Sequence, residues 1–339
     1  MATIKDIAEK TNLSITTVSR VLNYDPTLSV THATKQKVFE TAEKLNYTKH
    51  INKKQKRNEH LTNIAIIQWL DLKEEIEDIY YMSIRIGVER RAAELGFNLL
   101  KMTTEENGLP DDIEGILAIG KFDQDAVDEI AKLNKNVVFI GTNYPLNGFD
   151  TINGDFSQAS EIALSYLIKQ GHKKIGFIGA EDEKNLHGYR AYKSPSIYTF
   201  IDYLSSRDLF DESLFFFENT SEPNIQVGYK LMKKALDTLQ NNLPSAFFVV
   251  NDAMALGCLN ALRENNITVP DDISLISIND LSVSQFLTPA LTTVKVFTEE
   301  MGEVGINTLK ERIEADNSIE KRIILGTKLI ERDTVKKIN

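Results

Sequence analysis

Residues 3–23, TIKDIAEKTNLSITTVSRVLN, decide how this chain is interpreted. Thr3 can cap a first helix, and Asp6, three residues later, complements the positive end of that helix. A polar break at Asn12 follows, and Ser14 can cap a second helix. The two helices carry apolar residues that can face one another across the turn: Ile7, Ala8, Val18, Val21 and Leu22. The pattern therefore predicts two short helices joined by a tight turn.

The outward face of the second helix begins with short side chains. The residues that point away from the apolar seam are Ile15, Thr16, Ser19 and Arg20. Short residues at this end allow a helix to lie deep in the major groove of DNA, as the second helix of a helix-turn-helix does. The alternative is an ordinary helical hairpin with a solvated face.

A third helix and a basic linker follow. The helix starts at a Thr31 cap and carries Val38, Ala42 and Leu45 at helical spacing, so residues 1–47 form one small all-α unit. Residues 48–62, TKHINKKQKRNEHLT, are almost free of apolar side chains and cannot bury a face. This linker is either a solubilising tether or a hinge that orders against phosphates.

Charge is segregated along the chain. The first 60 residues hold eleven Lys and Arg against six Asp and Glu, whereas the whole chain has a net charge of −10. Binding of a polyanion depends on the local basic patch, and an acidic body discourages nonspecific adhesion elsewhere. The asymmetry therefore favours a DNA-binding head on an acidic body.

Several classes of protein are disfavoured by what the sequence lacks. No stretch approaches the roughly 20 apolar residues of a membrane span, and the N-terminus has no apolar signal core. Cys258 is the single cysteine, which excludes an internal disulfide and fits a reducing cytoplasm. The histidines show no metal-site spacing, and we find no Walker loop, dinucleotide fingerprint or Ser-His-Asp motif. We therefore expect no metal, no cofactor and no enzymatic activity.

From residue 63 onward, short apolar runs alternate with amphipathic helices. Two series of runs occur, at 64–67, 115–120 and 137–141, and then at 174–179, 246–250 and 274–278. Continuous apolar strands between helices are typical of parallel sheets covered on both faces, and two series indicate two α/β lobes. In such sheets, ligands bind beyond the carboxyl ends of the strands.

The chain resembles the LacI/GalR family of bacterial transcription regulators at motifs that run in family order from residue 3 to 332. In the head these are residues 3–8 and 13–23, and in the body QGHKKIGFIG at 170–179, NDAMALG at 251–257, VPDDISLI at 269–276 and LTPALTTV at 287–294. The stretches DIYY at 78–81 and GTKLIER at 326–332 are most similar to repressors of galactose and β-galactoside operons.

This resemblance implies a homodimer on a pseudo-palindromic operator, with a periplasmic-binding-protein-like core of two lobes that binds a small sugar between them. It also implies crossed connections. We therefore predict a first lobe from residues 63–155 and 293–318, and a second lobe from 156–292 and 319–332. The chain ends without the leucine heptads of the family's tetramers, which favours a dimer.

In the family, the two exposed residues after the recognition-helix cap read base edges, and here these are Ile15 and Thr16. Ile15 can pack on a thymine methyl, and Arg20 can make a bidentate contact to guanine. Short polar residues suit phosphate oxygens, which fix register without reading sequence: Ser14, Thr17, Ser19, Asn23 and Thr31. For Ser14 and Thr31, simple helix capping is the alternative.

The hinge departs from the family pattern Pro-Asn-x-x-Ala-x-x-Leu, whose leucine wedges into the minor groove. Lys49 and His50 stand at the Pro-Asn positions, Lys53 at the alanine and Lys56 at the leucine. We therefore predict a hinge that acts by neutralising phosphates through Lys53 and Lys56, with a weaker kink in the DNA.

Candidate effector residues follow the predicted strands. Asn251 and Asn279 each follow a buried strand, with Asp280 beside the second, and amides can donate to and accept from sugar hydroxyls. The family usually has an acid at the Asn279 position. Capping of the next helix is the alternative for Asn251.

Aromatic faces suit the apolar patches of a pyranose. Trp69 ends the first strand and Tyr80 starts the following helix, although core packing is the alternative for the tyrosine. Relatives place a sugar-binding arginine four residues before an aromatic, where this chain has Ser196 before Phe200. Arg190 in the preceding loop is the candidate replacement.

The sequence thus predicts a sugar-responsive repressor, with galactose or a galactoside as effector. The alternative within this class is control by a corepressor or a partner protein. A sugar-binding transport receptor would share the core but not the basic head. A carbohydrate enzyme would rest on the acidic run 181–183, which is more simply a solvated loop.

Overall fold

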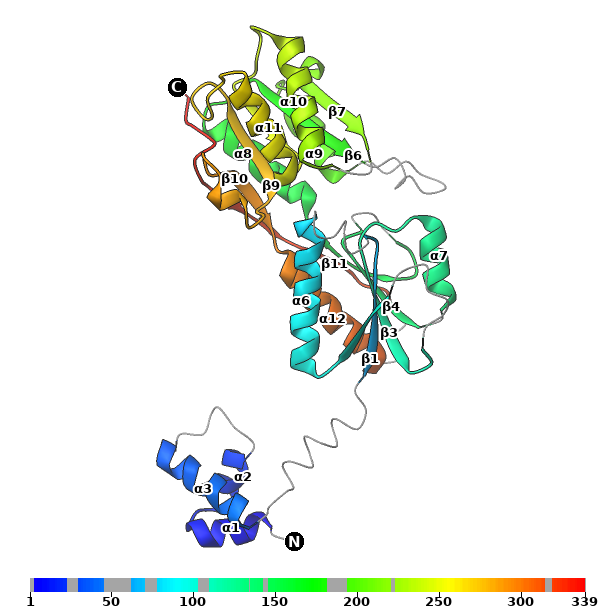
Figure 1. Ribbon diagram of the computed structural model, residues 1–339, viewed down its shortest axis with the longest axis vertical. Helices are drawn as coiled ribbons and strands as arrows, with labels where there is room; N and C mark the ends of the chain where they lie inside the picture. Colours follow the sequence, from blue (N-terminus) through cyan, green and yellow to red (C-terminus); the bar gives the residue numbers. More distant parts are fainter. Residues whose placement is uncertain are drawn as a thin grey trace. The chain divides into compact units, whose positions relative to one another are not determined.

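The computed structural model describes residues 3–22, 30–45, 62–70, 78–102, 110–133, 135–142, 146–181, 194–220, 223–314 and 319–338. The chain divides into two compact units, residues 1–62 and 63–339. They are called the head and the core below, and each is described by itself (Figure 1).

The head is built from three helices: α1 (Ile4–Thr11), α2 (Ile15–Leu22) and α3 (His32–Lys44). Thr3 and Asp6 form a capping box at the start of α1, and Asn12 ends that helix in the left-handed conformation with φ 56°. The buried cluster contains all five residues predicted to face one another across the turn, with Val38 and Ala42 from α3. The predicted helical head is therefore confirmed.

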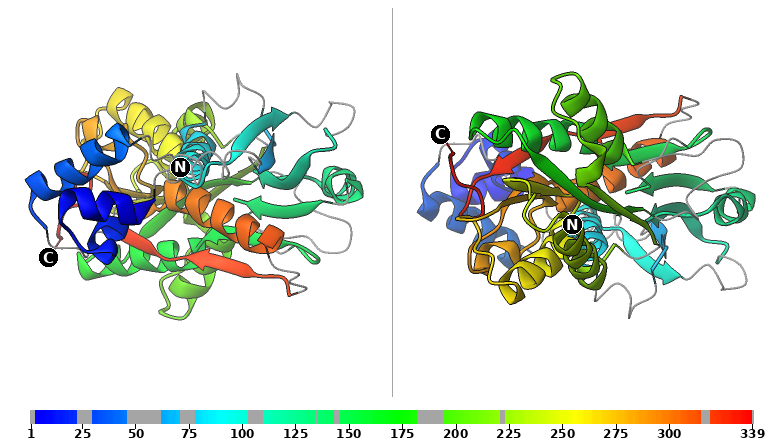
Figure 2. Two further views of the ribbon diagram at one scale, coloured as in Figure 1. Left: turned by 90° about the horizontal axis from the view of Figure 1, so that it is seen from below. Right: turned by 90° about the horizontal axis from the view of Figure 1, so that it is seen from above.

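The first lobe of the core contains sheet 1, a six-stranded parallel sheet. Its strand order is β11-β5-β4-β3-β1-β2, with β1 Asn63–Gln68, β2 Asn98–Met102, β3 Ile113–Ile119, β4 Asn136–Ile140, β5 Asp150–Gly154 and β11 Arg322–Leu325. Two helices that contact each other, α6 (Ile79–Leu95) and α12 (Thr298–Glu314), pack against this sheet, and α12 runs alongside β3, β4 and β5 (Figure 2). The amphipathic helix α7 (Gln124–Lys132) buries Val127 and Ile130 in a separate apolar cluster with side chains of β1, β3 and β4.

The second lobe contains sheet 2, with strand order β12-β10-β9-β8-β6-β7. The strands are β6 Ile175–Glu181, β7 Phe215–Asn219, β8 Ala246–Val249, β9 Ser274–Asn279, β10 Thr292–Val296 and β12 Thr327–Ile330. Its helices are α8 Phe156–Lys169, α9 Pro195–Ser205, α10 Ile225–Leu239 and α11 Asp252–Glu264, with short 3-10 turns η2 Glu212–Leu214 and η3 Ser284–Phe286. All pairs are parallel except β12 with β10, so the predicted class of two mostly parallel lobes is confirmed.

Two of the predicted lobe boundaries are wrong. Strand β11 pairs with β5 in sheet 1, although residues 319–332 were predicted to lie in the second lobe. Strand β10 pairs with β9 in sheet 2, although its residues from 293 were predicted to lie in the first lobe. The chain therefore crosses between lobes after β5, after β10 and between β11 and β12. A short strand carries no local signal for the sheet it joins, because that choice is made by pairing with distant segments.

These connections bring the carboxyl ends of the two sheets together. A Cβ added to Gly154, the last residue of β5, would lie 2.8 Å from Cγ1 of Val296, the last residue of β10. The amide of Asp155 donates to the carbonyl of Leu325 at 2.9 Å, which joins two of the connections. The carboxyl ends of β5, β10 and β11 therefore lie next to one another where the two lobes meet.

No helix in the described part of the chain combines the length and apolar character needed to cross a membrane.

Candidate DNA-reading helix and effector site

Helix α2 presents a distinct outward face. Val18 is fully buried in the head, whereas Ile15 at the start of the helix is 52% exposed and Thr16 is also exposed. Ser19 and Arg20 are partly exposed on the same helix. A large apolar side chain that protrudes at the start of a helix can contact an apolar group of a partner, such as the methyl of thymine.

The capping alternatives for Ser14 and Thr31 are present in the structure. The Ser14 hydroxyl accepts from the Thr17 amide at 3.0 Å and pairs with the Thr17 hydroxyl at 2.8 Å. Thr31 repeats this arrangement with Thr34, at 3.2 and 2.8 Å. Phosphate contacts by these residues stay a prediction, and Asn23, Lys53 and Lys56 lie outside the described residues.

Asn279 is the most unusual of the predicted effector residues. It ends β9 with φ 125°, a backbone conformation that residues other than glycine rarely adopt. Its side-chain Oδ1 is buried and has no hydrogen-bond partner among the described residues. A buried acceptor without a donor costs about 1–3 kcal/mol. The residue as a whole is partly exposed, so a rotation of its side chain would let this oxygen accept from a bound ligand.

Trp69 directly follows β1, at the carboxyl edge of sheet 1. Its amide donates to the carbonyl of Ile119 at 3.0 Å, and its ring meets Tyr81 edge-on with centroids 5.7 Å apart. Gly120, with φ 124°, leaves room for it, because an added Cβ would lie 2.4 Å from the Cβ of Trp69. The residue is partly exposed, which is compatible with contact to a ligand.

Tyr80 packs in the hydrophobic core, which was the alternative to a sugar contact. It is 8% exposed, its hydroxyl lies 4.0 Å from the sulfur of Met301, and its ring packs edge-on against Tyr81. Burial raises the pKa of the Tyr80 hydroxyl well above its ordinary value.

Asn251 and Asp280 both have partners inside the protein. The Oδ1 of Asn251 accepts from the Met254 amide at 2.7 Å, and its Nδ2 donates to the Pro223 carbonyl at 2.9 Å, so the residue caps α11. The Asp280 carboxylate pairs with Arg332 at 2.7 Å. The Asn251 amide and the Asp280 carboxylate, which were predicted to bind the sugar, are therefore bonded within the protein.

Ser196, at the predicted position of the arginine, lies inside the second lobe. Ser196 is 2% exposed within α9, and Phe200 is buried among aromatic rings of sheet 2. Arg190 and residues 182–183 of the acidic run lie outside the described residues.

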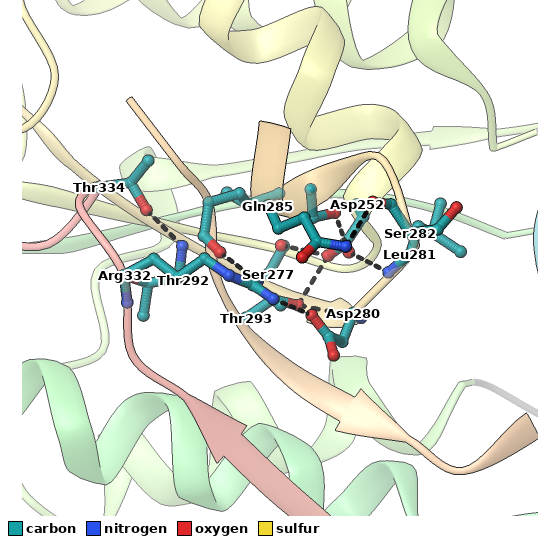
Figure 3. Close-up of polar contacts among 12 residues, drawn as sticks. Asp252, Ser277, Asp280, Leu281, Ser282, Gln285, Thr292, Thr293, Arg332 and Thr334 are labelled. Carbon is teal, nitrogen blue, oxygen red and sulfur yellow. Dashed lines mark hydrogen bonds and ion pairs between the residues drawn. The ribbon is translucent and has the colours of Figure 1, made fainter. Parts of the chain in front are cut away.

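Asp252 is the site residue that the sequence analysis missed. Its fully buried carboxylate accepts hydrogen bonds from Ser277, Leu281 and Thr293 (Figure 3). The Ser284 hydroxyl donates a fourth. Burial raises the pKa of this carboxyl, and the hydrogen bonds act against that shift. A signal was present in the sequence: Ser277 lies between two isoleucines of an expected buried strand, and a buried hydroxyl needs a partner.

Two further residues of types that can carry chemistry, His172 and Cys258, lie inside the protein. His172 is fully buried, with Nδ1 2.9 Å from the Ser245 hydroxyl and Nε2 3.1 Å from the Lys336 carbonyl. Cys258 is buried as well. In the described ranges, no cluster of His, Cys, Asp and Glu side chains could hold a metal ion.

A helix-turn-helix head and a two-lobe α/β core together define a DNA-binding regulator with a ligand-binding body. Residues 3–50 match the family described as bacterial regulatory proteins, lacI family, and residues 164–335 match the periplasmic binding protein-like domain. The chain belongs to the LacI family.

Relatives of this family match over the full chain. The chain is 36% identical over 339 residues to the HTH-type transcriptional regulator GalR of Streptococcus thermophilus, covering 99% of this chain and 100% of GalR. It is 34% identical over 346 residues to GanR of Bacillus subtilis (strain 168), covering 99% and 100%. These relatives are transcriptional regulators, which confirms the prediction of a regulator and not an enzyme.

Solved structures support the fold. The transcriptional regulator CelR–cellobiose complex matches with a TM-score of 0.68 at 21% identity, covering 98% of this chain and 100% of that one. The Lac repressor dimer bound to operator and the anti-inducer ONPF matches with a TM-score of 0.67 at 22% identity, covering 99% of each chain.

Proposed function

We propose that this protein is a repressor of a galactoside-utilisation operon, whose affinity for operator DNA is controlled by a small sugar bound between the lobes. The observation that carries the proposal is the buried, unpartnered Oδ1 of Asn279 in a chain with a DNA-reading head. Full-length similarity to GalR and GanR supports regulation of galactose or galactoside genes. We expect the protein to act in the cytoplasm as a homodimer.

On DNA, Ile15, Thr16 and Arg20 read base edges of a pseudo-palindromic operator. Each good bidentate contact, such as arginine to guanine, contributes about 1–3 kcal/mol of discrimination. Phosphate contacts fix the register, and we assign them to Ser14, Thr17, Ser19, Asn23, Thr31, Lys53 and Lys56.

In the core, the Oδ1 of Asn279 accepts a hydrogen bond from a sugar hydroxyl, and the indole of Trp69 packs against the sugar ring. The internal contacts of Asn251, Asp280 and Tyr80 favour supporting roles for these three residues, and Arg190 stays a candidate donor. A sugar changes DNA affinity only if it binds one arrangement of the lobes better than the other. Such a coupling typically amounts to about 1–3 kcal/mol.

Operator binding across a panel of sugars tests the proposal. The operator is first selected from random duplexes with purified protein, and its Kd is then measured by fluorescence anisotropy with galactose, lactose, allolactose, melibiose and glucose. We expect at least one galactoside to change the Kd by about 5–150-fold and glucose to have no effect.

The same assay distinguishes an inducing sugar from a corepressor, and a variant of Asn279 serves as its control. The Asn279→Ala variant should bind operator as the wild type does and lose the sugar response. A galactoside that raises operator affinity would instead identify a corepressor. An operator affinity that no sugar changes would refute the proposal.

A further inference from the structure

The turn that carries Asn279 is tied to the start of α11 by one buried carboxylate. Oδ1 of Asp252 accepts from the hydroxyls of Ser277 and Thr293, at 2.5 and 2.7 Å. Its Oδ2 accepts from the Leu281 amide at 2.8 Å (Figure 3) and from the Ser284 hydroxyl at 2.5 Å. Two bonds on each oxygen fill the usual acceptor capacity of a carboxylate.

Three of the four donors flank Asn279 in sequence, and the fourth lies in the strand that pairs with β9. Ser277 lies two residues before Asn279 in β9, Leu281 lies two residues after it, and Ser284 begins η3 beyond the turn. Thr293 in the neighbouring strand β10 also accepts from the amide of Asp280, at 3.4 Å. The carboxylate therefore holds both sides of the turn against two strands and one helix.

This support matters because the turn has an unfavourable backbone. Asn279 and Asp280 have φ of 125° and 58°, values that residues with a Cβ rarely adopt. Such conformations persist where the surrounding contacts over-determine them. The Arg332–Asp280 ion pair fixes the outer side of the turn, at 2.7 Å, and Asp252 fixes the inner side.

We infer that Asp252 is a positioning residue of the effector site, which sets where the Asn279 Oδ1 is presented to the sugar. Asp252 has no exposed surface, so it acts through the turn and not by touching the ligand. The inference rests on the proposed function, in which Asn279 binds the effector.

Three variants of the full-length protein test this role. Asp252→Ala removes all four acceptor contacts and leaves the Leu281 amide without a partner. Asp252→Asn can keep its oxygen on Leu281 and Ser284 and direct its amide to Ser277 and Thr293, whose hydroxyls can reverse to accept. Asp150→Ala is the matched control. Asp150 is a 2% exposed carboxylate at the start of β5, and it accepts from Arg312 at 2.8 Å and from the Lys321 amide at 2.6 Å.

The readouts are the galactoside Kd by calorimetry, operator affinity without sugar, and hydrogen exchange at the Leu281 amide in sugar-free protein. We expect Asp252→Ala to weaken sugar binding at least tenfold, to lose protection of the Leu281 amide and to keep its operator affinity. Asp252→Asn should stay within about threefold of the wild type. Asp150→Ala should unfold at lower temperature but keep its sugar affinity and its Leu281 protection.

Equal weakening by Asp252→Ala and Asp150→Ala would overturn the inference, since it would indicate general destabilisation. Unchanged protection of the Leu281 amide in Asp252→Ala would do the same. If Asp252→Ala does not fold, Ser284→Ala removes a single donor and should weaken sugar binding several-fold, and an unchanged Kd would contradict the role. A wild-type protein that binds no galactoside would instead refute the proposed function, and the inference with it.

Discussion

Asn279 combines two unfavourable features at one position. Its φ of 125° strains the backbone, and its buried Oδ1 lacks a donor among the described residues. Strain of this kind costs about 1–3 kcal/mol per residue and is concentrated where function requires it. The sequence identified Asn279 as a candidate because it follows a buried strand. It could not reveal the strain, which arises from the turn that Asp252 and Arg332 hold.

Replacing Asn279 by glycine should therefore separate stability from function. Glycine adopts positive φ without a steric penalty and removes the unpaired oxygen, so the free energy of unfolding should rise by about 1 kcal/mol. Urea denaturation measures this gain, and the sugar response should be lost in the same variant. Asn266→Gly, at φ 57°, is the control that should gain stability and keep the response. A less stable Asn279→Gly protein would argue against strain at this position.

At the scale of single elements, helix α2 was the most predictable part of the molecule. The 3.6-residue period fixes which residues are buried, so Val18, Val21 and Leu22 were assigned correctly to the inner face. Strand β11 was not predictable in the same way. Its apolar residues 323–325 alternate between half-buried and exposed, and nothing local says which sheet they join, because the pairing with β5 spans more than 160 residues.

Helix α2 also allows a direct test of base reading. Arg20→Ala should weaken operator binding about 10–100-fold and relax the preference at one base pair, because a bidentate contact is lost. Selection of operators from random duplexes with the variant measures both effects. Lys35→Ala, on the exposed side of α3, should leave the base preference unchanged. A variant at Arg20 that keeps the full wild-type preference would contradict its assigned role.

His172, which contacts the C-terminal segment at the Lys336 carbonyl, allows a test by pH. Burial lowers the pKa of His172 below its ordinary value of 6.5, whereas the unfolded chain has no such burial. Unfolding below that pH therefore takes up a proton. The contribution of His172 to the free energy of unfolding is therefore fully present above about pH 6.5. Below that pH it decreases, by at most about 1.4 kcal/mol per pH unit.

Urea denaturation between pH 7.5 and 5 measures this dependence. His172→Gln should be less stable at pH 7.5, because the histidine's contacts to Ser245 and Lys336 change, and its stability should fall less steeply below pH 6.5. Equal slopes for the two proteins would show that His172 is not the group responsible.

For the whole molecule, charge separates the basic head from the acidic core. Eleven basic residues in the first 60 concentrate the attraction for DNA, although the chain as a whole carries −10. The sequence predicted this division. It could not supply the geometry of Lys53 and Lys56, which lie outside the described residues.

The lysine-rich linker should be detectable as salt dependence. Lys53→Ala and Lys56→Ala should each flatten the slope of log K against log salt by nearly one unit per lost phosphate contact in each subunit. Titrations from about 50 to 200 mM salt cover the range where this effect is large. DNA bending equal to that of a leucine-bearing relative, measured by gel mobility, would contradict the predicted weak kink.

The central claim is that one sugar, bound at the carboxyl edges of the two sheets, is thermodynamically coupled to the operator. Coupling is reciprocal, so the factor by which sugar changes operator affinity must equal the factor by which operator changes sugar affinity. The decisive measurement is the galactoside Kd by calorimetry, with and without saturating operator DNA. We predict a change of about 5–150-fold, equal to the change in operator Kd caused by the sugar and absent in Asn279→Ala. A galactoside Kd that operator leaves unchanged would contradict the account.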